Sequence, residues 1–207
     1  MKVIKYLYKS LNKYQISSKQ VEVIIQDLID RYNEKNRIYH NLDHIENMFD
    51  VLLKYKTKIK NFESVLYACC FHDVIYDTKC NNNEEKSSKY AIVLLKKIGI
   101  DSDTINNTKN LILATKNHTL LNNNFDEKIF IDSDLTILGA KRSRYIKYMK
   151  AVRKEYSWVS LNDYSKSRIK VLKKLLNKKS IYYTYELYSK YEIKARYNLE
   201  YEIHHLE

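Results

Sequence analysis

The chain has 207 residues, of which 44% are hydrophobic and 30% charged, with no proline and only two glycines, Gly99 and Gly139. This composition can fill a core, and it excludes a disordered chain, a collagen and a disulfide-stabilised miniprotein. Because tight turns rely on glycine and proline, it also argues against a β-sandwich, a β-barrel and a glycine-rich phosphate loop. The sequence therefore predicts a single all-α domain.

Apolar residues recur with helical spacing along the chain and predict a series of helices. In chain order we expect helices at about 3–12, from Ser17 or Ser18 to about 29, at 42–52, at 62–76, at 84–98, from Asp101 or Asp103 to about 118 and at 126–138, then two or three basic helices within 141–178 and a last helix at 181–203. The 62–76 helix is apolar nearly all round, so we expect it at the centre. Gly99 and Gly139 are expected to end the helices that precede them.

The three cysteines, Cys69, Cys70 and Cys80, are odd in number and do not make a disulfide framework. Cys69 and Cys70 lie within an apolar run and are expected to be buried. The first residues lack the continuous apolar stretch of a signal peptide, and no uncharged run is long enough to cross a bilayer. We therefore expect a cytoplasmic protein with no membrane partner.

The net charge of +12 is concentrated in one part of the chain. Residues 141–196 contain 17 basic and 4 acidic residues, whereas the remainder contains 20 basic and 21 acidic ones. One explanation is a lysine-rich composition of the kind that AT-rich genomes encode. The other is attraction of a polyanion, which would be a nucleotide, a nucleic acid or a phosphoester.

Four polar clusters interrupt the apolar helices: YHNLDH at 39–44, FHDVIYD at 71–77, LATKNH at 113–118 and DSDLTILGA at 132–140. Histidine nitrogens with carboxylate oxygens suit Zn, Mn, Fe, Co or Ni, and helical bundles build metal sites from such side chains on interior helices. Burying His72 beside Asp73 is costly unless something pairs them. Taken singly, each histidine has the simpler explanation of an ordinary hydrogen-bonded residue, and Asp43 and Asp132 also suit helix caps.

The order His, His-Asp, Asp on a helical bundle resembles the HD-domain superfamily of metal-dependent phosphohydrolases. One subgroup of predicted HD phosphohydrolases is also similar at NNEEKSS (82–88), AVRKEY (151–156) and EIKARYNLEYE (192–202), so that the resemblance covers about 37–202. It implies an HD-domain helical bundle at 20–203 with basic C-terminal helices at 141–196, preceded by an N-terminal helical extension at 1–19.

The resemblance also implies roles for individual residues. The four metal ligands of the superfamily match His44, His72, Asp73 and Asp134. Two further histidines, His40 and His118, are candidates for a second metal or for phosphate contact. Asp73 and Asp77 are the candidate catalytic residues, because a helix would place Asp77 on the same face as Asp73 as a general acid–base or water-orienting group.

The candidate substrate-binding residues are Glu84, as a pocket residue, and three arginines, Arg153, Arg168 and Arg196. A guanidinium group binds phosphate in a bidentate manner, and arginine is scarce in this lysine-rich chain. Structural ion pairs explain the arginines equally well, for example Arg196 with Glu192 or Glu200 on the same helix.

The function that the resemblance implies is hydrolysis of a phosphoester in a small phosphorylated metabolite by a metal-activated water, with a nucleotide as the favoured substrate. The divalent metal would be Mn, Fe, Co, Ni, Zn or Mg, and a homodimer is compatible with the sequence. Two alternatives stay open. One is a di-iron HD oxygenase. The other is a nucleotide- or nucleic-acid-binding module with a structural metal, which the basic segment 141–196 and the twenty tyrosines favour.

Overall fold

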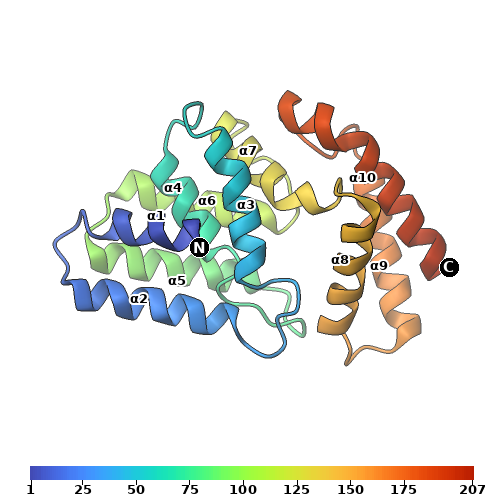
Figure 1. Cartoon of the computed structure of the whole chain (residues 1–207), viewed down its shortest axis with the longest axis horizontal. Coiled ribbons are helices and arrows are strands. Elements are labelled where there is room, and N and C mark those ends of the chain that lie inside the picture. Colours follow the sequence, from blue (N-terminus) through green and yellow to red (C-terminus); the bar gives the residue numbers. More distant parts are fainter. The chain divides into compact units, whose positions relative to one another are not determined.

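The computed structural model describes residues 1–207, and all of its regular elements are helices (Figure 1). This confirms the predicted all-α class. The internal contacts divide the chain into two compact units, Met1–Ile131 and Asp132–Glu207. None of the helices combines the length and the hydropathy that a membrane span requires.

The first unit contains six helices and most of a seventh. They are α1 (Lys2–Leu11), α2 (Ser18–Tyr32), α3 (Leu42–Lys54), α4 (Phe62–Phe71), α5 (Asn83–Ile98), α6 (Ser102–Thr115) and α7 (Phe125–Asp134), whose last residues from Asp132 belong to the second unit. The predicted helices match these in order and in approximate bounds.

Helix α4 is the centre of the first unit, as its sequence predicts. Every residue from Ser64 to Phe71 is buried, including Cys69 and Cys70, whose thiols are free. The helix packs against α1, α3, α5 and α6. A helix that is apolar on all sides can be stable in water only when neighbours cover each side, which explains its central position.

Side-chain caps set the beginnings of several of these helices. Ser17 and Gln20 form a capping box at the start of α2, Asn41 accepts hydrogen bonds from two amides at the start of α3, and Asp101 caps α6. Helix α5 ends at Gly99, as predicted, because this residue adopts the left-handed conformation with a φ of 87°. Such a φ favours glycine, which has no Cβ to clash.

Helix α1, which lies in the predicted N-terminal extension, packs against α2, α3 and α4. The carboxylate of Glu63 at the start of α4 accepts hydrogen bonds from Ser10, from Lys13 (3.2 Å) and from Tyr14 (3.0 Å). This one acidic side chain therefore anchors the end of α1 to the central helix. The boundary proposed at residue 19 stays a prediction.

The second unit contains the short 3-10 helix η1 (Leu135–Ile137) followed by α8 (Arg142–Glu155), α9 (Leu161–Leu176) and α10 (Tyr185–Leu206). Helix α10 packs against α8 and α9. Its buried Glu202 pairs with Arg168 (2.8 Å) and accepts a hydrogen bond from Tyr145 (2.5 Å). A buried carboxylate needs such partners, so this network holds α8, α9 and α10 together.

Two sequence predictions about helix ends are wrong. The helix predicted at 62–76 ends at Phe71, because the amides beyond it find other partners: the amide of Val74 donates to the carbonyl of Phe71 three residues back, and the amide of Ile75 donates to the hydroxyl of Ser87. Gly139 does not cap a helix, since α7 ends at Asp134 and η1 at Ile137. Glycine is needed there for a different reason, because a Cβ would lie 2.5 Å from the Cβ of Tyr191.

Candidate metal centre

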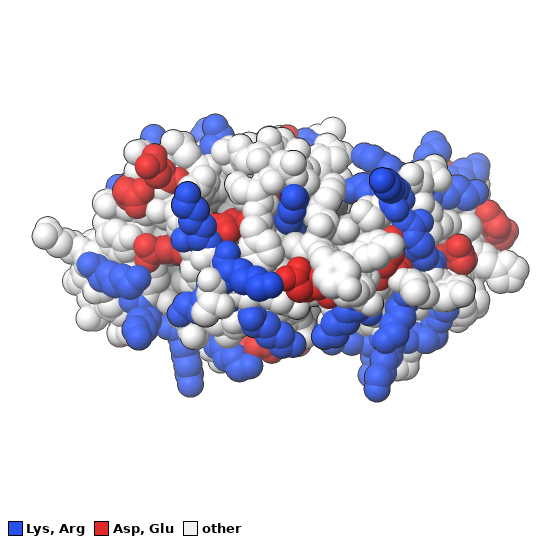
Figure 2. Space-filling model, turned by 90° about the horizontal axis from the view of Figure 1, so that it is seen from above, with Lys and Arg blue, Asp and Glu red and all other residues white.

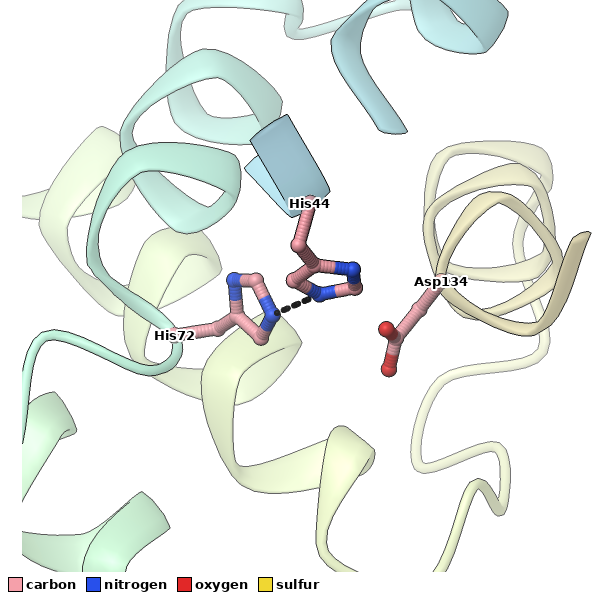
Figure 3. A group of neighbouring side chains, drawn as sticks. All are labelled: His44, His72 and Asp134. Carbon is pink, nitrogen blue, oxygen red and sulfur yellow. Dashed lines mark hydrogen bonds between the residues drawn. The ribbon is translucent and has the colours of Figure 1, made fainter. Parts of the chain in front are cut away.

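Three of the predicted metal ligands converge. His44 lies in the first turn of α3, His72 directly follows α4, and Asp134 is the last residue of α7. Each offers one ligand atom, and these atoms all lie within 4.8 Å of one another. Figure 3 shows the two imidazole rings and the carboxylate directed toward a common point. This group could hold a metal ion.

The hydrogen bond at the far side of the His72 ring sets its protonation. The Nδ1–H group donates to the carbonyl oxygen of Cys69 at 3.1 Å, and a carbonyl oxygen can only accept. In the neutral ring the proton is therefore on Nδ1, and Nε2 carries a lone pair. That lone pair faces the Nε2 atom of His44 at 3.2 Å. A backbone carbonyl that orients an imidazole in this way is typical of metal-binding histidines.

Asp73 completes the arrangement within the first unit. Its Oδ2 atom lies 3.1 Å from Nε2 of His72 and 3.8 Å from Nε2 of His44. Burial by itself would raise the pKa of Asp73, but in the metal-free protein the positive charge and hydrogen bond of protonated His72, with the charges of His40 and His44 when they are protonated, outweigh it and hold that pKa well below its ordinary value. The carboxylate of Asp73 is therefore anionic at neutral pH and offers a cation one negative charge.

The spacing of these atoms fits a bound divalent cation. Nitrogen and oxygen ligands lie about 2.0–2.2 Å from Zn²⁺, which places neighbouring ligand atoms roughly 3 Å or slightly more apart. The atoms of His44, His72 and Asp73 lie 3.1–3.8 Å apart. The donor set of imidazole and carboxylate is the one that Zn, Mn, Fe, Co and Ni share. The residues present therefore fit the metal.

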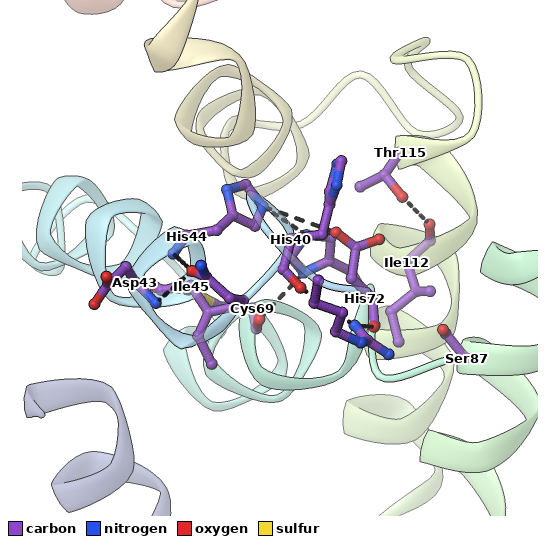
Figure 4. A network of polar contacts seen from close by, with 12 residues as sticks. His40, Asp43, His44, Ile45, Cys69, His72, Ser87, Ile112 and Thr115 are labelled. Atoms are coloured by element: carbon purple, nitrogen blue, oxygen red, sulfur yellow. Dashed lines mark hydrogen bonds and ion pairs between the residues drawn. The ribbon is translucent and has the colours of Figure 1, made fainter. Parts of the chain in front are cut away.

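His40 lies beside this group but not on the same helix as His44. It precedes α3, which begins at Leu42. The rings are nevertheless close, with centroids 5.8 Å apart, and the His40 ring stacks on Tyr76 at 4.3 Å. Figure 4 shows His40 beside His44 and His72. His40 is therefore placed to contact a molecule bound at this site.

The loop that follows Asp73 is held by residues of the NNEEKSS motif. The hydroxyl of buried Ser87 accepts from the amide of Ile75 (3.0 Å) and donates to the carbonyl of the same residue (3.1 Å). The side chain of Asn83 bonds both backbone groups of Asp77 in the same manner. This part of the motif thus supports the loop that carries Asp73.

The structure places three other candidates at the edge of the group or outside it. Asp77 is exposed, and it does not share a helical face with Asp73, because α4 has already ended. The amide of Lys79 and the thiol of Cys80 donate hydrogen bonds to Asp77 and thereby lower its pKa. Glu84 is half-buried in the first turn of α5, where burial raises its pKa and the charge of Asp73 adds to the rise. His118 lies in the turn after α6 with a φ of 48°.

The three candidate phosphate-binding arginines belong to the second unit, where each has internal partners. Arg153 donates to the carbonyl oxygens of Tyr156 and Val159, and Arg168 pairs with Glu202. Arg196 pairs with Glu192 at 2.7 Å, which confirms the structural ion pair considered from the sequence. A role in substrate binding stays a prediction for all three.

Asp132 and Asp134 have different partners, although they are two residues apart. Asp132 is fully buried and accepts hydrogen bonds from the amides of Tyr183 and Thr184 and from the Thr184 hydroxyl. These bonds support the beginning of α10, whose N-cap is Thr184. Burial outweighs them and raises the pKa of Asp132 to about 6. Asp132 is thus a helix-supporting residue, and Asp134 is the acid in the group that could hold a metal ion.

Sequence reasoning missed one residue of this region, Arg37. Its guanidinium group donates to the carbonyl oxygens of Asp73 (2.6 Å), Val74 (3.1 Å) and His40 (3.4 Å). The sequence offers one signal for this residue, the scarcity of arginine. An arginine in a lysine-rich chain indicates a position where the planar guanidinium group, with its several donors, is required.

Comparisons with known proteins add no assignment, because no protein-family model, no curated protein and no solved structure matches this chain.

Proposed function

We propose that this chain is an HD-type metal-dependent phosphohydrolase that cleaves a phosphoester of a small phosphorylated metabolite, with a nucleotide as the favoured substrate. The observation that carries the proposal is the convergence of His44, His72 and Asp134, with Asp73 against both imidazoles. The resemblance of the four motifs to the HD superfamily supports the choice of reaction. The cytoplasmic location that the free cysteines favour is part of the same proposal.

A bound divalent cation would supply Lewis-acid polarisation of a phosphoryl oxygen and would lower the pKa of water. His44, His72, Asp73 and Asp134 would hold it. His40, half-buried beside the group, can donate a hydrogen bond to a phosphate oxygen. Glu84, half-buried in the first turn of α5, would line the substrate pocket.

The test is elemental analysis of the purified protein followed by phosphate release from a panel of nucleotides and sugar phosphates. We expect a first-row divalent metal, or one that binds on addition, and turnover that requires it. His72→Ala and Asp73→Ala should lose both metal and turnover, whereas the exposed His205→Ala should keep both. Turnover that survives in both site variants would overturn the proposal, and iron-dependent oxygen uptake without phosphate release would favour the oxygenase.

A second candidate function is binding of nucleic acid, and one observation favours it. Helix α8 carries exposed basic residues that have no ion-pair partner and that recur every three or four positions. They are Arg144, Lys147, Lys150 and Lys154. Figure 2 shows Lys and Arg side chains over much of the drawn face, with acidic side chains among them. Phosphate backbones bind such cations with release of counterions, so affinity falls steeply with salt.

This candidate is tested by the affinity for single-stranded DNA and RNA as a function of salt concentration. A steep salt dependence that a Lys147→Glu, Lys150→Glu double variant removes, together with no turnover on any phosphoester, would favour it. A salt dependence unchanged by the double variant would exclude this surface.

A further inference from the structure

Arg37 is an unusual side chain because it is charged and almost fully enclosed. It lies between α2 and α3, and only 1% of its side chain is exposed. The carboxylate of Glu34 accepts a hydrogen bond from its Nε at 3.1 Å and provides a counter-charge. Placing a guanidinium group in such a position is costly, so its hydrogen bonds must compensate.

The partners of Arg37 belong to two segments that are far apart in the sequence. It donates to the carbonyl oxygens of Asp73 and Val74, which follow the end of α4. The Nη1 atom that donates to Asp73 also donates to the carbonyl oxygen of His40, just before α3, at 3.4 Å. One planar group thus joins the backbone of a predicted ligand, Asp73, to the segment that leads into His44.

Aromatic rings enclose this junction. The guanidinium carbon of Arg37 lies 5.1 Å from the ring centroid of Tyr32 and 5.5 Å from that of Tyr76. Tyr76 in turn stacks on His40. The rings exclude water from one side of the hydrogen bonds, which strengthens them and limits the freedom of the guanidinium group.

We infer that Arg37 is a positioning residue of the proposed metal centre, and this inference rests on the proposed function. Its guanidinium group holds the backbone of Asp73 and of His40 in one fixed relation, which keeps the Asp73 carboxylate against the imidazoles of His72 and His44. Lysine cannot replace it, because an ammonium group lacks the planar fork that reaches several carbonyl oxygens at once.

The test measures metal affinity rather than turnover. Co²⁺ is titrated into the metal-free protein and followed by its visible absorption, for the wild type and for Arg37→Lys and Arg37→Ala. We expect both variants to bind Co²⁺ about 10–100-fold more weakly, the usual cost of losing a group that orients metal ligands, and to show an altered absorption band. The matched control is Arg31→Lys, because Arg31 lies six residues before Arg37, in the last turn of α2, but pairs with Asp27 and contacts Tyr90.

The possible failures are distinguishable. If the wild type binds no Co²⁺, the proposed function fails. If the wild type binds and folded Arg37→Lys binds with the same affinity and spectrum, the inference about Arg37 is overturned. Thermal unfolding of each metal-free variant shows whether it is folded, and Arg37→Lys, which keeps the charge and most of the bulk, provides the answer if Arg37→Ala does not fold.

Discussion

The Nε2 atoms of His44 and His72 lie 3.2 Å apart, although the residues are 28 positions apart in the sequence and belong to different helical segments. Because the Nδ1 proton of His72 is directed to the carbonyl of Cys69, a lone pair of His72 faces His44. Two imidazole nitrogens and the carboxylate of Asp73 therefore meet at one point. Burying these polar groups in an apolar core costs free energy, and a cation bound by them would offset that cost.

Metal binding should therefore stabilise the folded chain. With a suitable divalent cation at 100 times its dissociation constant, we expect the free energy of unfolding to rise by about 2.7 kcal/mol. Differential scanning fluorimetry with and without chelator measures the change. His44→Ala should abolish it, whereas His204→Ala, which alters an exposed histidine, should not. An identical midpoint for the wild type in both conditions would contradict a metal centre.

Tyr32→Phe should stabilise the protein. Tyr32 is fully buried, and its hydroxyl has no hydrogen-bond partner. Removing a buried hydroxyl that makes no bond recovers its desolvation cost, so we expect a gain of about 1 kcal/mol in urea unfolding. Tyr67→Phe is the control, because that buried hydroxyl bonds Ser10 at 2.8 Å and its loss should destabilise the fold by about 1 kcal/mol. Equal losses in both variants would refute the argument.

The two glycines should respond differently to alanine. Gly99 has space for a Cβ but a φ of 87°, so Gly99→Ala should cost about 1–2 kcal/mol of backbone strain. At Gly139 the added Cβ would lie 2.5 Å from the Cβ and 2.8 Å from the carbonyl oxygen of Tyr191, so Gly139→Ala should cost about 3 kcal/mol. Urea unfolding of both variants tests the order, and a larger loss at Gly99 would show that α10 shifts readily.

Acid should weaken the attachment of α1. Burial raises the pKa of Glu63, but hydrogen bonds from Ser10, Tyr14 and Lys13 outweigh it and lower that pKa below its ordinary value of 4.5. The stabilisation that ionised Glu63 provides is thus complete above about pH 4.5. It is lost as the pH falls through the lower pKa that Glu63 has in the folded state. Glu63→Gln should be less stable than the wild type at pH 7, and the difference should shrink as the pH falls below 4.5. A difference independent of pH would contradict this assignment.

Much of this structure follows from local signals. The order of the helices, a cap at Ser17 or Ser18 and at Asp101 or Asp103, the end of α5 at Gly99 and the central place of α4 all follow from periodicity and from residues adjacent in sequence. These features depend on backbone groups within a few residues of one another, which is why the sequence alone determined them. The selection of His44, His72 and Asp134 as one group came from motif order and agrees with their convergence.

Only the tertiary structure decided where distant side chains place their hydrogen bonds. It ended α4 near Phe71 by supplying the Ser87 hydroxyl to the amide of Ile75, and it directed Asp132 to the start of α10. It also paired Arg168 of α9 with the buried Glu202 of α10. Helical periodicity reports which face of a helix is apolar, whereas a buried polar group is satisfied by whichever partner the packing brings within about 3 Å, and that partner can lie anywhere in the chain.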